Sequence, residues 1–313
     1  MRELRDRVVE AVSKVVVGQD EAVELVLVAA ATRGHALLEG PPGVAKTLLA
    51  NAVARALGLP FRRVQFTPDM LPSDLTGTMA LRGQELVFRP GPVFASVLLA
   101  DEINRTPPKT QAALLEAMQE RQVTVEGETF PLHAPFHVVA TANPVEYEGT
   151  YPLPEAQLDR FLMRVSFGYP GRNEEWEVLR RRMDRQREEQ RLDAVTDRVG
   201  LLAMQAAIET VTVEESVGRY CVALAKETRS HPHVLMGSSP RGALALMLTA
   251  RSYAVIQGRD YVIPEDVKVV APAVLAHRIT VKPELWMSDV SGGSVTKGVL
   301  AQVAVPSALD PPA

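Results

Sequence analysis

The chain has 313 residues, a formal net charge of −4, and 46% hydrophobic and 23% charged residues. Its length predicts two domains with sizeable cores, and its composition is typical of a soluble globular protein. The acidic balance argues against general nucleic-acid binding and leaves only a local basic patch open. Because no apolar run is long enough to cross a membrane and the N-terminal residues lack a signal-peptide core, we expect a cytoplasmic protein.

Cysteine and histidine usage gives no sign of a disulfide or a metal cluster. Cys221 is the only cysteine, which excludes an intrachain disulfide and fits a reducing compartment. It lies at helical spacing from Val217 and Leu224, so we interpret it as a small core residue. His133 and His137 could be a spaced ligand pair, but a structural role is favoured because they fall in a strand-like region.

The N-terminal region predicts two helices and then a glycine-containing loop. Helices are expected at about 4–13 and from about residue 20, and an apolar run at 36–38 predicts a strand. The loop that follows this strand reads Gly40-Pro41-Pro42-Gly43-Val44-Ala45-Lys46-Thr47, and a helical pattern runs from Leu48 onward. In this order the backbone N–H groups and the positive helix end can surround a phosphate. An ordinary Gly-Pro turn is the alternative interpretation.

Individual residues of this loop suggest distinct roles. Lys46 would place its charge on the β and γ phosphates, and the Thr47 hydroxyl would ligate Mg²⁺. The strict pattern has glycine before the lysine, whereas this chain has Ala45. We expect that residue to have entered the helix already, where a positive φ is not needed and alanine fits.

An acidic pair ends the next strongly apolar segment. Residues 97–100 form a continuous apolar run, which predicts a strand buried on both faces of a parallel sheet. Asp101 and Glu102 would then emerge at the carboxyl edge, where ligands bind in open α/β sheets. Asp101 would hold Mg²⁺ directly or through water, and Glu102 would act as general base on the attacking water. A solvated acidic turn is the alternative.

The rest of the first half predicts further strands and two hairpins. The expected elements are strands at 61–66, 136–142 and 161–167, a helix at 107–120, and hairpins at 78–88 and 123–131. Asn143 ends the strand at 136–142, where an amide beside the acidic pair can orient water and touch the γ-phosphate. An Asn-Pro turn residue is the alternative.

Near residue 169 the strand patterns stop and helical patterns dominate. The fold class we predict is a three-layer αβα core with a parallel sheet over residues 1–168, followed by a small all-α lid domain over 196–280. Residues 169–195 alternate in charge, which predicts a helical linker with a solvated face. Residues 281–313 form a weakly patterned tail.

Together these motifs resemble the AAA+ P-loop ATPases, and the MoxR family in particular, up to about residue 280. The ordered signatures that carry the resemblance are Val17-Gly18-Gln19, residues 65–77, residues 88–94 and residues 153–161. The resemblance implies that Asn143 is sensor 1, Arg160 is an arginine finger for the neighbouring subunit, and Arg241 is sensor 2. The implied nucleotide-binding residues are Val17, Gly18, Gln19, Gly40, Pro41, Pro42, Gly43, Val44, Ala45, Lys46, Thr47, Leu48 and Arg241.

The two arginines can also be judged by their local surroundings in the sequence. Arg160 would neutralise charge that develops on the transferred phosphoryl group, but it could form only a surface pair with Asp159. Arg241 opens a predicted helix, where a cation is mildly unfavourable for the helix dipole, so a phosphate partner is more plausible there.

The resemblance implies Mg²⁺-dependent ATP hydrolysis in a ring, a hexamer in the family, that does work on a partner protein. MoxR relatives act as chaperone-like ATPases in metal-cofactor insertion or complex maturation, often with proteins that carry a von Willebrand factor A domain. Two alternatives are a nucleic-acid-stimulated translocase and a nucleotide-gated binding module with little turnover. The acidic balance argues against the first, and the Asp101–Glu102 pair against the second. The hairpins would face the ring centre or be simple exposed turns.

Overall fold

A five-stranded parallel sheet organises the first half of the chain. The computed structural model describes residues 1–143, 150–186 and 192–306. The strand order is β2-β5-β8-β1-β9, and every neighbouring pair is parallel. The strands are β1 (Ala36–Glu39), β2 (Phe61–Gln65), β5 (Val97–Asp101), β8 (His137–Ala142) and β9 (Met163–Ser166). Residues that follow these strands therefore share one edge, which we call the carboxyl edge.

Helices cover both faces of this sheet, which confirms the predicted three-layer core. Side chains alternate between the faces, so consecutive residues of β5 enter different cores. Leu99 belongs to the core that includes α2 (Asp20–Ala31) and α3 (Lys46–Ala56), whereas Leu98 belongs to the core that includes α5 (Pro108–Glu120). Burial on both faces explains why β5 is apolar until its last residue.

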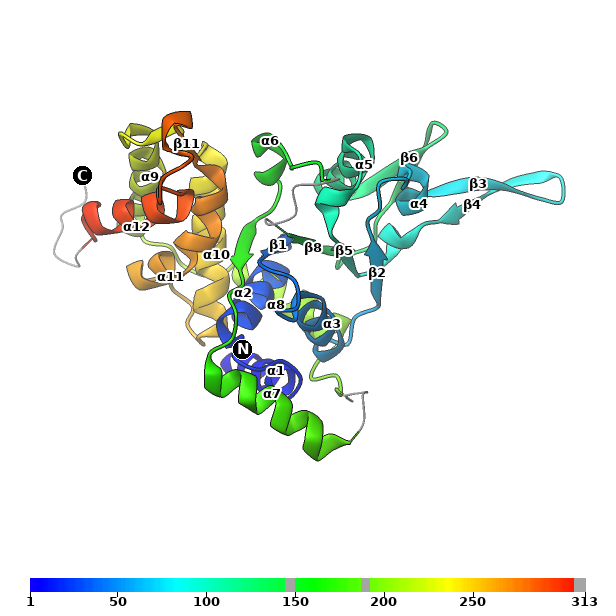
Figure 1. The fold of residues 1–313 in the computed structure, drawn as a ribbon, viewed down its shortest axis with the longest axis horizontal. Helices are drawn as coiled ribbons and strands as arrows, with labels where there is room; N and C mark the ends of the chain where they lie inside the picture. The colour runs from blue at the N-terminus through cyan, green and yellow to red at the C-terminus, as the bar shows by residue number, and fades with distance from the viewer. Residues whose placement is uncertain (144–149, 187–191, 307–313) are drawn as a thin grey trace.

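Further helices and two hairpins complete the first half. They are α1 (Arg2–Ser13), α4 (Pro72–Thr76), α6 (Glu155–Leu158), η1 (Pro92–Phe94) and η2 (Ile103–Arg105). Two antiparallel hairpins, β3–β4 (Gly77–Arg82 and Glu85–Pro90) and β6–β7 (Gln122–Val125 and Glu128–Pro131), project from one end of the molecule (Figure 1).

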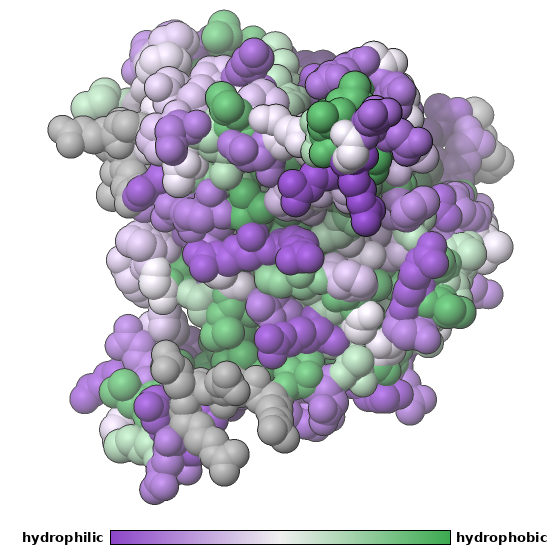
Figure 2. Space-filling view, turned by 90° about the vertical axis from the view of Figure 1, so that its right-hand side faces the viewer, coloured by the Kyte–Doolittle hydropathy of each residue, from purple (hydrophilic) through white to green (hydrophobic). Residues whose placement is uncertain are grey.

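The hairpins are joined at their bases and exposed along their length. Phe88 of β4 stacks on Phe130 of β7, with ring centroids 3.8 Å apart. Farther out, Leu81 and Leu86 are mostly exposed. Figure 2 looks at the end of the molecule from which the hairpins project and shows a mainly hydrophilic surface with scattered hydrophobic residues. Both hairpins occur where the sequence predicted them.

Helices make up most of the second half. They are α7 (Arg172–Arg185), α8 (Arg198–Ile208), α9 (Glu215–Ser230), α10 (Pro240–Ile256), α11 (Pro264–Leu275), η3 (Ala276–Arg278), η4 (Pro283–Leu285) and α12 (Gly292–Gln302). None of the α7 residues is buried, which matches its alternating charges, and the end of the predicted linker lies partly outside the described residues. Cys221 is buried in α9, and burial raises the pKa of its thiol to about 12.

The structure adds detail to two expectations for this half. The lid is helical, and it also contains a short antiparallel pair of strands, β10 (Val234–Met236) and β11 (Thr280–Val281). The weakly patterned residues 281–313 include α12, in which Val295 and Val299 are buried. The small residues at the start of α12 weakened the sequence pattern, but they allow close packing: a Cβ on Gly292 would lie 2.0 Å from the Ala276 carbonyl oxygen. Among the described residues, no helix combines the length and apolarity that a membrane crossing requires.

Candidate active site

The loop after β1 has the form that phosphate binding needs. Gly43 has φ +82°, and a Cβ built on it would meet no atom within 4 Å, so open space lies beside the loop. The loop leads directly into the first turn of α3, whose unpaired N–H groups and positive dipole end favour an anion. The loop and the helix start that directly follow β1 are thus formed by Gly40, Pro41, Pro42, Gly43, Val44, Ala45, Lys46, Thr47 and Leu48.

The expectation for Ala45 was wrong. It has not entered the helix but is its N-cap residue, with φ 65° and ψ 23°. The chain must turn between the loop and the helix, and it does so in the left-handed region at this residue. For an L-residue this conformation costs about 1–2 kcal/mol, which glycine would avoid.

The first two residues of α3 contact the groups that we predicted to surround a triphosphate. Lys46 Nζ donates hydrogen bonds to the carbonyl oxygens of Gly40 and, at 3.1 Å, Pro41. The Thr47 hydroxyl lies 3.1 Å from Oδ2 of Asp101, which comes from the adjacent part of the carboxyl edge. The loop and the acidic strand, predicted separately, therefore meet.

Asp101 is buried, and two residues that the sequence analysis missed compensate its charge. Thr141 on β8 donates to Oδ1 of Asp101 at 2.6 Å and accepts from the backbone N–H of Glu102 at 2.8 Å. Arg63 on β2 donates from Nε to Oδ2 of Asp101 at 2.9 Å. These charge-assisted bonds hold the carboxylate at the strand end.

Glu102 lies beside Asp101 but points to a different set of partners. It has φ 59°, in the left-handed region, which turns the chain immediately after β5. Gln65 of β2 donates from Nε2 to Oε2 of Glu102 at 2.6 Å, and Arg105 lies 3.0 Å from the same oxygen. The carboxylate is partly exposed, so it is accessible to water.

Asn143 reaches the same edge. It directly follows β8, which lies between β5 and β1 in the sheet, and it is buried. Its carbonyl oxygen accepts a hydrogen bond from Nδ2 of Asn104 at 3.3 Å, which ties it to the η2 turn that follows Glu102.

A hollow of about 390 Å³ lies between the N-terminal segment, β9 and the lid. Gly18 and Gln19 line it, and Val17 directly precedes them. Ala276 of η3 lines the opposite, lid side. Its volume falls in the range of small-molecule sites, so a nucleotide base and sugar can be accommodated there.

The donor set fits magnesium as well as nucleotide. Mg²⁺ prefers oxygen ligands and is usually bound by one or two protein side chains together with substrate phosphates. Thr47 and Asp101 offer a hydroxyl and a carboxylate within hydrogen-bond distance of each other, next to the open loop. The described residues contain no cluster of three or more His, Cys, Asp or Glu that could hold a metal by itself.

The histidine pair considered from the sequence does not form a metal site. His137 is buried, and its Nδ1 lies 3.1 Å from the Gly34 carbonyl oxygen, whereas His133 is exposed. Burial lowers the pKa of His137 to about 4, so it is neutral at pH 7. The structural role was the better interpretation.

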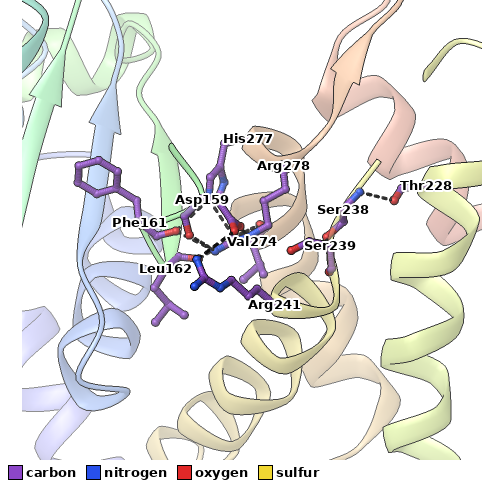
Figure 3. Close-up of polar contacts among 10 residues, drawn as sticks. All are labelled: Asp159, Phe161, Leu162, Thr228, Ser238, Ser239, Arg241, Val274, His277 and Arg278. Atoms are coloured by element: carbon purple, nitrogen blue, oxygen red, sulfur yellow. Dashed lines mark hydrogen bonds and ion pairs between the residues drawn. The ribbon is translucent and has the colours of Figure 1, made fainter. Parts of the chain in front are cut away.

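Two predicted site residues do not join this group. Arg160 precedes β9, and the pairing of Ala36 with Met163 places it beyond the end of β9 opposite the phosphate loop. Arg241 opens α10 on the same side, with its guanidinium 3.9 Å from Asp159 (Figure 3). The sensor 2 role of Arg241 therefore stays a prediction, and its guanidinium lies beside Asp159 and not beside the phosphate loop of its own chain.

The residues that sequence reasoning missed are Arg63, Gln65 and Thr141 at the carboxyl edge, and Arg278 of η3, which hydrogen-bonds to Asp159. A weak signal existed for two of them. Arg63 and Gln65 are two positions apart in β2, so they lie on the same face near the end of the strand. Gln65 pairs in register with Asp101. Recognising them required knowing that β2 lies next to β5, which the sequence alone does not state.

A parallel sheet with this strand order, a phosphate loop after β1, an acidic pair after β5 and a helical lid define an AAA+ P-loop ATPase. Residues 35–163 match the ATPase family associated with various cellular activities (AAA), and residues 226–295 match the AAA lid domain. The chain belongs to the MoxR family of AAA+ ATPases, and its reaction is the hydrolysis of ATP.

Several relatives align over nearly the whole chain. "Chaperone MoxR1" of Mycobacterium tuberculosis is 44% identical, with 96% of this chain and 82% of the relative covered. "Uncharacterized protein YeaC" of Bacillus subtilis is 45% identical, with 97% and 95% covered. "Protein MoxR" of Methylorubrum extorquens is 37% identical, with 87% and 86% covered. A crystal structure of a candidate ATPase from Cytophaga hutchinsonii has a TM-score of 0.90 and 42% identity, with 98% and 96% covered.

Proposed function

We propose that this chain hydrolyses Mg²⁺-bound ATP at the interfaces between subunits of a ring and uses the reaction to do work on a partner protein. The observation that carries the proposal is the contact between Thr47 and Asp101 beside the open phosphate loop. It brings the predicted metal ligands together, with the predicted base Glu102 adjacent in sequence.

Each residue of the carboxyl edge would have a separate role in binding or hydrolysing ATP. Lys46 would exchange the carbonyl oxygens of its own loop for phosphate oxygens, because a charged acceptor forms the stronger hydrogen bond. A bound Mg²⁺ would neutralise charge on the β and γ phosphates. Thr47 and Asp101 would hold that ion, and Arg63 would give up its contact with Asp101. Glu102 would take the proton of the attacking water, and Asn143 would orient that water.

Arg160 and Arg241 would act on the ATP of a neighbouring subunit. Both lie beyond the end of β9 opposite the phosphate loop of their own chain. A four-residue strand is about 13 Å long, beyond the reach of an arginine side chain. Two arginines at a subunit edge suit the stabilisation of charge on a transferred phosphoryl group.

A protein client is the partner that the relatives favour. One relative bears the name "Chaperone MoxR1". We therefore propose a chaperone-like role in complex maturation or metal-cofactor insertion. A hexameric ring, a partner with a von Willebrand factor A domain and a cytoplasmic location stay predictions.

A phosphate-release assay on the purified protein tests the proposal. We expect slow but measurable turnover that rises more than proportionally with protein concentration, since a shared site needs assembled subunits. Arg160→Ala should bind ATP normally and turn over very slowly. Turnover strictly proportional to concentration would contradict a finger supplied by a neighbour, and strong stimulation by single- or double-stranded DNA would favour a translocase.

A further inference from the structure

The one-turn helix η3 (Ala276–Arg278) links the core to the lid through a buried arginine. The Arg278 side chain is 4% exposed. Its Nε donates to Oδ1 of Asp159 at 2.7 Å, and its terminal nitrogens donate to the carbonyl oxygens of Phe161 (2.9 Å) and Leu162 (3.2 Å) (Figure 3). One lid side chain therefore holds the whole segment that leads into β9.

The segment that Arg278 holds contains Arg160. Asp159 directly precedes Arg160, and its second oxygen lies 3.9 Å from Arg241, another lid residue. Arg241 is largely exposed and distant, so its contact is weak, whereas the enclosed Arg278 contact is the firm one. The position of Arg160 therefore depends on the position of the lid of its own subunit.

The other side of η3 faces the hollow that we assign to the nucleotide base and sugar. Ala276 lines this hollow together with Gly18 and Gln19. Gly292, whose neighbours Ser291 and Gly293 line the same hollow, packs so closely on the Ala276 carbonyl that no side chain would fit between them. Ala276 therefore cannot move toward Gly292 without moving α12 as well. Arg278 is only two residues farther along the same turn, so we expect a movement of Ala276 to reach it.

His277, between these two residues, adds a neutral contact. Its Nε2 lies 3.0 Å from the Phe161 carbonyl oxygen. Burial, and after it the charge of Arg278, lowers the pKa of His277 well below its usual value, so the ring carries no charge. Arg278 therefore supplies the only positive charge that η3 places on this segment.

We propose that η3 is a coupling element: occupancy of a subunit's own nucleotide site sets the position of Arg278 and, through Asp159, of the Arg160 that the subunit offers to its neighbour. Asp159 and Arg278 are then positioning residues, and neither touches the reacting atoms. This inference rests on the proposed function, because it requires Arg160 to act between subunits. It adds a physical route by which nucleotide binding in one subunit affects ATP hydrolysis at the nucleotide site of the neighbouring subunit.

The experiment mixes two inactive full-length variants. Arg160→Ala is the acceptor, with intact sites and no finger. Glu102→Gln is the donor, with a finger and no catalytic base. ATP hydrolysis in the mixture comes from acceptor sites that receive Arg160 from a donor, and its rate is measured over a range of ATP concentrations up to saturation. Asp159→Asn or Arg278→Ala is then added to the donor in one series and to the acceptor in another.

We expect either added change to lower the restored kcat about tenfold or more when it is in the donor, since small misplacements of a catalytic group are costly. The same change in the acceptor should alter it less than about twofold, because the acceptor's own finger segment is already without Arg160. The KM for ATP should stay constant in the donor series. A purely structural role would lower kcat equally from both positions.

Controls keep the outcomes distinct. Arg259→Ala in the donor removes another lid ion pair, with Asp266, and should leave restoration unchanged. Arg278→Lys tests the same contact if the alanine variant does not fold. If the unmodified mixture regains no activity, Arg160 is not shared and the proposed function falls together with this inference. If the mixture regains activity and the donor changes have no effect, or act equally from both positions, the inference alone is overturned.

Discussion

Ionic contacts at the carboxyl edge of the sheet differ in kind from those at the junction between core and lid. Arg63, which contacts Asp101 at the edge, has a side chain that is 52% exposed, whereas Arg278, which contacts Asp159 at the junction, is 4% exposed. In water-exposed surroundings an ion pair contributes little and is easily exchanged. In enclosed surroundings, removing one partner leaves an uncompensated charge.

This difference in exposure matches two different tasks: the carboxyl edge binds ligands, and the junction transmits a displacement between lid and core. At the edge, Lys46 and Arg63 hold provisional partners that a phosphate or a metal ion can replace. At the junction, Arg278 has several acceptors at once and no competing ligand to receive it. A site that must load and unload needs exchangeable contacts, and an element that must carry a displacement needs contacts that persist.

The largest effect should come from Glu102→Gln, which alters the edge alone. Without a general base, the rate of ATP hydrolysis should fall about 10²- to 10⁴-fold, whereas ATP binding should be kept because the phosphate contacts remain. Phosphate release and calorimetry measure the two quantities separately. Glu116→Gln, on the exposed side of α5, is the matched control and should change neither. Hydrolysis at the parent rate would exclude Glu102 as the base.

Lys46→Ala should weaken ATP binding about 100-fold. The reason is the loss of a charged donor to phosphate oxygens, worth about 1.5–3 kcal/mol for each such bond. Calorimetry on the purified protein gives the affinity directly. Lys109→Ala, at an exposed position of α5, removes the same charge elsewhere and should leave the affinity unchanged. An unaffected affinity in Lys46→Ala would contradict the phosphate role of the loop.

The edge was predictable from the sequence to a greater extent than the junction, for a physical reason. Residues 40–47 and 97–102 are continuous runs in which strand, turn and charged residues appear in order. The parallel arrangement then brings the runs together without further information. The contacts of Asp101 with Arg63 and Thr141 span 38 and 40 residues, so they depend on strand order.

The junction depends on even more distant residues. Arg278 and Asp159 are 119 residues apart, and nothing in the local pattern of either segment indicates a partner. The helix α12 was missed for a related reason, because its small residues make sense only against the turn on which they pack. Tertiary contacts of this kind are absent from any window of sequence.

Comparing two arginine deletions tests the contrast in stability. Arg278→Ala should lower the free energy of unfolding by about 3 kcal/mol, because Asp159 is left uncompensated in a largely enclosed place. Arg63→Ala should lower it by less than about 1 kcal/mol, since water can replace the half-exposed guanidinium and buried Asp101 keeps its hydrogen bonds from Thr47 and Thr141. Denaturant titration gives both values. Equal losses of unfolding free energy in the two variants would show that burial of the arginine does not decide how much each ion pair stabilises the protein.

Arg63→Ala should also lower the Mg²⁺ concentration for half-maximal ATP hydrolysis by roughly threefold. The guanidinium competes with the cation for Asp101, and the competition is weak because the guanidinium is half exposed to water. A Mg²⁺ titration at fixed ATP measures the shift. Arg62→Ala removes an exposed charge from the adjacent position of β2 and should not change the midpoint. A raised Mg²⁺ requirement in Arg63→Ala would mean that Arg63 supports the metal site.

The smallest effect concerns the backbone of the phosphate loop. Ala45→Gly should raise the free energy of unfolding by about 0.5–1 kcal/mol, because relief of the left-handed conformation outweighs the added freedom of the unfolded chain. Ala112→Gly in α5, at an exposed helical position, should lower it by about 1 kcal/mol. The same substitution should thus have opposite signs in denaturant titration. If Ala45→Gly destabilises the protein as Ala112→Gly does, alanine is not strained there, and the loop edge gains no stability from the glycine of the strict pattern.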